Sequence, residues 1–95
     1  MFIHIFGFRW KPEATDLDKA RARKEILAFR NTIPGLVAVN VGRNVSPRGK
    51  GYEFVGLMTF TSRDACEAYG THPAHLALLE WLVPLIDAVE LDFEA

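Results

Sequence analysis

The stretch "MFIHIFGFRW", residues 1–10, decides the fold, because it is almost entirely apolar and rich in aromatic and β-branched side chains. Such a composition predicts a β-strand, in which alternate residues point to opposite faces of the sheet. One face carries Phe2, His4, Phe6 and Phe8, and the other carries Ile3, Ile5 and Gly7. Both faces therefore need cover, although one layer of helices can cover only one face of a sheet. We expect a second copy of the chain to cover the other face.

The next segments predict a helix and two further strands. The helix is expected to begin at Thr15 or Asp16 and to run to about Asn31, and Pro34 then prevents its continuation. Its core stripe comprises Ala22, Ile26, Phe29 and Ile33. Apolar runs at residues 36–42 and about 52–60 predict the two strands, and Gly56 leaves a notch in one face of the later strand.

The second half of the chain predicts a helical region in two pieces and a closing strand. Residues 61–71 form a short helix, and a second helix runs from Pro73 to Leu85 because proline is favoured at the first helical position. The closing stretch "DAVELDFEA" alternates apolar and acidic residues. The order βαββαβ predicts a ferredoxin-like α+β sandwich with a split second helix. Residues 1–95 are expected to form one domain, since 95 residues suffice for only one hydrophobic core.

Composition argues against several classes of function. The chain has 11 Lys and Arg against 12 Asp and Glu, so it has no basic bias toward nucleic acid or anionic lipid. No apolar stretch approaches the roughly 18 residues of a membrane span. The single Cys66 cannot form an internal disulfide, and the first ten residues lack a signal-peptide pattern, so we expect a cytoplasmic protein. The glycines at 49–51 precede a strand rather than a helix, which argues against a phosphate-binding loop.

The stretch "YGTHPAH", residues 69–75, holds the candidate catalytic groups. With Pro73 at the first helical position, His72 is expected to cap the helix and His75 to lie in its first turn. The positive end of a helix dipole favours a neutral imidazole there, which can act as a general base. Tyr69, at the end of the preceding helix, can donate its phenolic O–H to an oxygen that gains negative charge. A base and a donor together are what enolisation requires, and His4 on the first strand could face the same cavity.

Structural interpretations of these residues stay open at this stage. Tyr69 and His75 could simply satisfy one another's hydrogen bonds in the core, and His4 could be a core histidine. His72 and His75 are spaced for a metal, but Cys66 is on another helix and no carboxylate completes the set, so we expect no metal site. Cys66 itself is expected to be a small packing residue.

The whole chain resembles the stress-responsive dimeric α/β-barrel (Dabb) domain family. The resemblance rests on "FIHIFGF", "IPG", "VGRNVSPRGKGYEF", "YGTHPAH" and "LDFE". It implies a homodimer in which two sheets pack face to face as a barrel, with a ligand cavity between each sheet and its helices. A well-understood plant member is a cofactor-free polyketide cyclase that performs an intramolecular aldol condensation. Its tyrosine and histidine fall on Tyr69 and His75, and its first-strand histidine falls on His4.

We therefore expect a cavity for a carbonyl-containing or polyketide-like small molecule, with catalytic His75 and Tyr69 and with no cofactor. Its predicted lining comprises His4, Phe6, Phe8, Ala22, Ile26, Gly56, His72 and Leu78. Ala22 and Ile26 stand where the cyclase has bulky aromatics, so the substrate should differ. The alternatives are a non-catalytic, stress-related binding dimer and a cofactor-free monooxygenase. Some plant relatives hold a magnesium-type ion near the dimer interface, but no cluster of oxygen ligands predicts one here.

Overall fold

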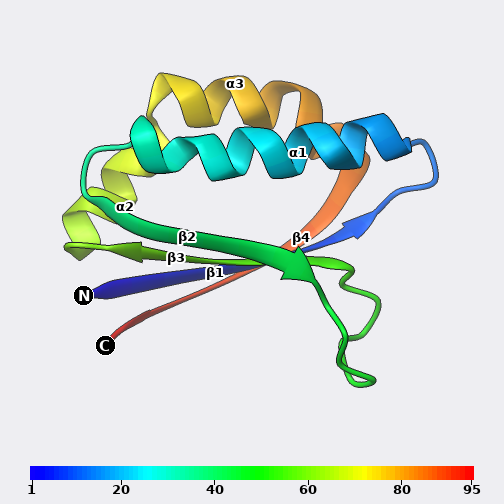
Figure 1. Cartoon of the computed structure of the whole chain (residues 1–95), viewed down its shortest axis with the longest axis horizontal. Coiled ribbons are helices and arrows are strands. Elements are labelled where there is room, and N and C mark those ends of the chain that lie inside the picture. The colour runs from blue at the N-terminus through cyan, green and yellow to red at the C-terminus, as the bar shows by residue number, and fades with distance from the viewer.

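The chain forms one four-stranded antiparallel sheet, in the order β2-β3-β1-β4, with its helices on one face (Figure 1). This computed structural model describes all residues from Met1 to Ala95. Its elements are β1 (Phe2–Trp10), α1 (Asp16–Ala28), β2 (Leu36–Arg43), β3 (Phe54–Phe60), α2 (Arg63–Gly70), α3 (Pro73–Leu82) and β4 (Ile86–Glu94), with 3-10 turns η1 (Phe29–Asn31) and η2 (Val83–Leu85). The predicted ferredoxin-like α+β fold and its split second helix are confirmed.

The helix boundaries follow from their caps. Thr15 caps α1, accepting a bond from the Asp18 N–H while the Asp18 carboxylate accepts one from the Thr15 N–H. These bonds lower the pKa of Asp18. The helix is shorter than predicted, because residues 29–31 tighten into η1, as the last turn of a helix often does. The third strand also begins later than predicted, at Phe54, and Tyr52 instead lies under the guanidinium of Arg9.

The core lies between the helices and one face of the sheet. It comprises fourteen buried hydrophobic residues, among them the whole predicted stripe of α1 and the adjoining turn: Ala22, Ile26, Phe29 and Ile33. On β1, the even-numbered residues from Phe2 to Phe8 are buried, as the alternation predicted. Opposite Phe6 stands Gly56 on β3, and the Phe6 ring fills the space above this glycine. The predicted notch therefore exists, but an aromatic side chain of the same subunit occupies it.

Replacing Gly56 with alanine should destabilise the protein by about 1–3 kcal/mol, because a Cβ at this position would overlap the Phe6 ring and overpack the core. Urea unfolding followed by circular dichroism measures the change. Gly70→Ala is the control, since nothing lies within 4 Å of a Cβ built there and alanine favours the helix. Equal stability of Gly56→Ala and wild type would show that the Phe6 ring is not confined as described.

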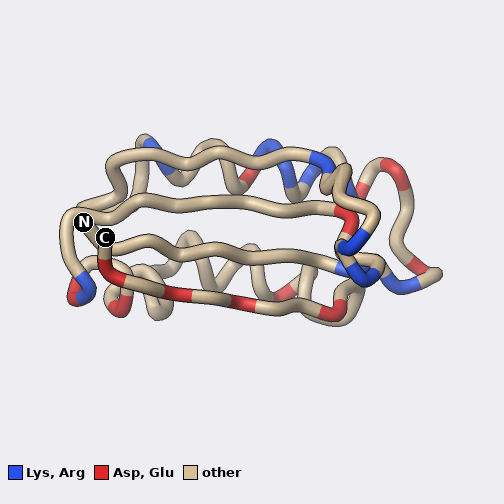
Figure 2. Tube along the Cα trace, turned by 90° about the horizontal axis from the view of Figure 1, so that it is seen from below, with Lys and Arg blue, Asp and Glu red and all other residues tan.

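The other face of the sheet carries no helix and is apolar. Strand β4 is an edge strand whose Val89, Leu91 and Phe93 pair with Gly7, Ile5 and Ile3 of β1 and share this open face. Leu91 is 59% exposed and Phe93 is 50% exposed. Glu90, Asp92 and Glu94 alternate with them and point to the helix side, whereas Asp87 is on the open face beside Arg9. Figure 2 shows the acids of β4 along the sheet edge. No helix is long and apolar enough to cross a membrane.

Candidate active site

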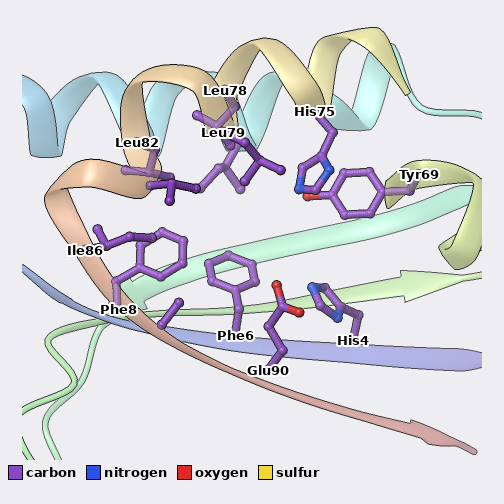
Figure 3. A pocket seen from close by; sticks show the side chains of 13 residues that line it. His4, Phe6, Phe8, Tyr69, His75, Leu78, Leu79, Leu82, Ile86 and Glu90 are labelled. Atoms are coloured by element: carbon purple, nitrogen blue, oxygen red, sulfur yellow. The ribbon is translucent and has the colours of Figure 1, made fainter. Parts of the chain in front are cut away.

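A cavity of about 130 Å³ lies between the sheet and α3, on the helix side of β1 (Figure 3). Ten of its thirteen lining residues are hydrophobic. Strand β1 supplies the floor, α3 the roof, and β4 one wall, and Tyr69 reaches in from the end of α2. The lining comprises His4, Phe6, Phe8, Ile26, Tyr69, His75, Leu78, Leu79, Leu82, Val83, Ile86, Ala88 and Glu90. An apolar cavity with a few converging polar groups is the usual form of a small-molecule site.

Most residues expected at the site lie in this lining: His4, Phe6, Phe8, Ile26, Tyr69, His75 and Leu78. Three others lie outside it. Ala22 is completely buried in the core face of α1, and Gly56 lies beneath the Phe6 ring. His72 caps α3 as predicted, because its Nδ1 accepts a hydrogen bond from the Ala74 N–H at 3.1 Å. Its imidazole therefore serves the helix terminus rather than the cavity.

His75 is held so that one ring nitrogen remains free. Its Nδ1 lies 3.0 Å from the carbonyl oxygen of Gly70. A carbonyl oxygen can only accept a hydrogen bond, so Nδ1 must carry the hydrogen. In the neutral ring, Nε2 then keeps its lone pair and can take a proton. The last residue of α2 thus sets the tautomer of a residue in the first turn of α3.

Tyr69 packs against His75, with ring centroids 4.2 Å apart. The rings of Phe29 and Phe60 also surround it, and only 7% of the residue is exposed. The Tyr69 hydroxyl has no hydrogen-bond partner within the chain. Every fully buried side-chain nitrogen or oxygen has such a partner, so this hydroxyl is not fully buried and faces the cavity. Burial raises the pKa of Tyr69, and the negative charge of Glu90 raises it further. The phenol therefore stays protonated and acts as a donor.

His4 is oriented by a carboxylate that sequence reasoning missed. Its Nδ1 lies 2.5 Å from Oδ1 of Asp92, which stands directly opposite on β4. The carboxylate accepts from Nδ1 and fixes the imidazole ring against the cavity. Glu90, two residues earlier, was also missed and lines the cavity itself. The alternation of β4 could have shown that both acids share a face, but not that this face is the one with the cavity.

Cys66 lies outside the cavity lining and is partly buried. Burial raises the pKa of Cys66 to about 11, with further contributions from the charges of Asp92, Glu90 and Glu67. The side chain is therefore an un-ionised thiol at neutral pH, which makes it a poor nucleophile. No group of three or more His, Cys, Asp or Glu side chains is placed to hold a metal ion.

Comparison with known proteins connects this chain to a family. Residues 2–95 match the family described as the stress responsive A/B barrel domain. The chain is 31% identical to olivetolic acid cyclase from Cannabis sativa over 75 residues, which cover 77% of this chain and 74% of the cyclase.

Solved structures of similar proteins agree on the fold. Hydroxynitrile lyase from Passiflora edulis has a TM-score of 0.87 at 18% identity, covering 97% of this chain and 90% of the lyase. A dimeric ferredoxin-like protein of unknown function from Thermobifida fusca has a TM-score of 0.84 at 25% identity, covering 99% of this chain and 90% of that protein. Proteins of this fold thus have different activities, and the fold alone assigns none of them. Because the family match extends over nearly every residue, the chain belongs to the stress responsive A/B barrel domain family.

Proposed function

We propose that the cavity binds a small, largely apolar molecule with a carbonyl group, and that His75 and Tyr69 enolise this ligand without a cofactor. One observation carries the proposal: a free imidazole nitrogen and an unpartnered phenol lie side by side and line the same apolar cavity. A lone buried tyrosine or histidine would support only a packing role. The pair supplies a base and an acid for one reaction.

The step requires a proton to leave the carbon next to the carbonyl. Nε2 of His75 takes this proton, and the electron pair of the C–H bond forms the carbon–carbon double bond of the enolate. The carbonyl π electrons move to oxygen, where the Tyr69 O–H donates a hydrogen bond to the developing charge. Such a bond is stronger in an apolar, water-poor cavity than in water. Both catalytic groups in this step are side chains of this protein.

The enolate can then attack a second carbonyl of the same ligand. This attack forms a carbon–carbon bond and leaves an alkoxide, which takes back the proton held by His75. The overall change is the addition stage of an intramolecular aldol condensation, before water is lost. The relationship to olivetolic acid cyclase supports this reaction class over others. The ligand is expected to be different, because Ile26 is the residue of α1 that lines the present cavity, where the cyclase has bulky aromatics.

We further propose that the protein acts as a homodimer, with the open sheet face of each subunit covering that of the other. The half-exposed Leu91 and Phe93 support this arrangement, since a large exposed apolar patch usually marks an interface. The related protein from Thermobifida fusca is dimeric. Both faces of β1 are then buried, and the cavities lie on the outer, helix-covered sides.

Deuterium exchange tests the enolisation. Wild-type protein in D₂O should exchange the α-hydrogens of heptan-2-one faster than buffer alone, as followed by proton NMR. Tyr69→Phe should lower the enzyme-dependent rate by roughly 10²–10³-fold, because it removes the one donor aimed at the developing oxyanion. Its ring still fills the same space, so the melting temperature serves as the folding control.

The same experiment distinguishes a binding protein from an enzyme. Line broadening of heptan-2-one signals in the presence of the protein, without enhanced exchange, would favour the non-catalytic binding dimer. Exchange that survives Tyr69→Phe unchanged would reject the role assigned to this hydroxyl.

A further inference from the structure

Glu90 is a charged residue in an otherwise apolar wall. It lies on edge strand β4 directly opposite Phe6, and its side chain rises into the cavity between Phe6 and His4 (Figure 3). It is the one acid among the thirteen lining residues, which include no lysine or arginine. The residue is exposed, so it stands where the cavity meets solvent. A ligand that enters on this side passes its carboxylate.

The charge of Glu90 is not neutralised by the protein. The four ion pairs of the chain involve other carboxylates, and no side-chain hydrogen bond reaches Glu90. The neighbouring acid on the same face, Asp92, is engaged by His4. The negative charge of Glu90 also acts on Tyr69, where it raises the pKa of the phenol and so disfavours a second negative charge in the cavity.

We propose that Glu90 is a specificity-determining residue, which makes the cavity select uncharged carbonyl compounds over carboxylates of the same shape. The inference rests on the proposed ligand-binding function and names its ligand class more closely. A carboxylate in this cavity would lose water, meet no lysine or arginine, and share the cavity with the like charge of Glu90. A ketone carries no charge, so none of these three energetic penalties applies to it. Esters, ketones and other neutral carbonyl compounds therefore fit, and free acids do not.

Two probes of nearly equal shape isolate the charge. Heptan-2-one and hexanoate share a five-carbon tail on a carbonyl, and they differ by a methyl group against a charged oxygen. Their dissociation constants would be measured at pH 8 by amide NMR titration, with shifts in α3 and β4 reporting occupancy of the cavity. The proteins compared are wild type, Glu90→Gln and Glu94→Gln. Glu94 lies on the same face of β4, opposite Phe2 and outside the cavity lining, so it controls for the loss of one negative charge.

Wild type should bind heptan-2-one in preference to hexanoate. In Glu90→Gln this preference, expressed as the ratio of the two dissociation constants, should fall by about tenfold, as expected for removing a like charge from the same, partly aqueous site. In Glu94→Gln the ratio should match wild type. An unchanged ratio in Glu90→Gln, or an equal change in both variants, would overturn the role of Glu90 while leaving the cavity as a ligand site. Failure of wild type to bind either probe would instead overturn the proposed function itself.

Discussion

Replacing His75 with alanine should lower the enzyme-dependent exchange of heptan-2-one by roughly 10²–10⁴-fold, the usual contribution of a positioned general base. The expectation rests on the bond between Nδ1 and the Gly70 carbonyl, which leaves Nε2 as the nitrogen that can accept a proton. The other lining histidine, His4, is engaged by Asp92, and the Glu90 carboxylate lies on the exposed edge strand, so His75 is the free imidazole beside Tyr69. Proton NMR of heptan-2-one in D₂O measures the rate directly.

His72→Ala is the matched control, because this histidine lies three residues earlier and caps the same helix. It should retain the exchange rate and lose about 1 kcal/mol of stability, since the Ala74 N–H loses its acceptor. The two variants are thus expected to separate chemistry from stability within one short segment. Retained exchange in His75→Ala, or a loss of exchange in His72→Ala as large as in His75→Ala, would contradict the assignment of the base.

The second large effect concerns the open sheet face. Wild type should elute as a dimer in size-exclusion chromatography with light scattering, and Leu91→Asp should elute as a monomer. A dimer of Leu91→Asp would bury two unpaired carboxylates in its apolar interface. The dissociation constant of the dimer should therefore rise by more than about a hundredfold. Leu91 is 59% exposed within one subunit, so the substitution leaves the subunit core intact. Circular dichroism would verify that the monomer is folded.

Leu76→Asp provides the comparison on the opposite side of the molecule. Leu76 lies on α3, is 50% exposed, and does not line the cavity. It has similar exposure to Leu91 but lies on the helix layer, so its substitution should leave the dimer unchanged. Dissociation by Leu76→Asp together with a dimeric Leu91→Asp would place the interface on the helices rather than the sheet.

Much of the fold can be predicted from local signals in the chain. The alternation in β1 identifies its buried face, and Pro73 fixes where α3 begins, which in turn places His75 in its first turn. These signals are strong because they depend on backbone geometry close in sequence. The lengths of α1 and β3 are less well predicted, because the 3-10 turn after Ala28 and the stacking of Arg9 on Tyr52 depend on packing.

The charged part of the site depends on contacts that sequence alone does not reveal. Asp92 meets His4 across 88 positions of sequence, and Glu90 meets the cavity only because β4 pairs with β1 in one particular register. A shift by one residue would reverse the assignment of every β4 side chain. The filling of the Gly56 notch by Phe6 has the same origin, since it depends on which residues of β1 and β3 stand opposite one another.

The alternation of β4 also has a consequence for how the chain tolerates insertions and deletions. Its odd-numbered apolar residues lie on the open face, while Glu90 and Asp92 face the cavity side. A single residue gained or lost between η2 and β4 that shifted this register would bring carboxylates onto the apolar face and leucine and phenylalanine beside His4. A single insertion or deletion there would thus impair both dimer assembly and ligand recognition.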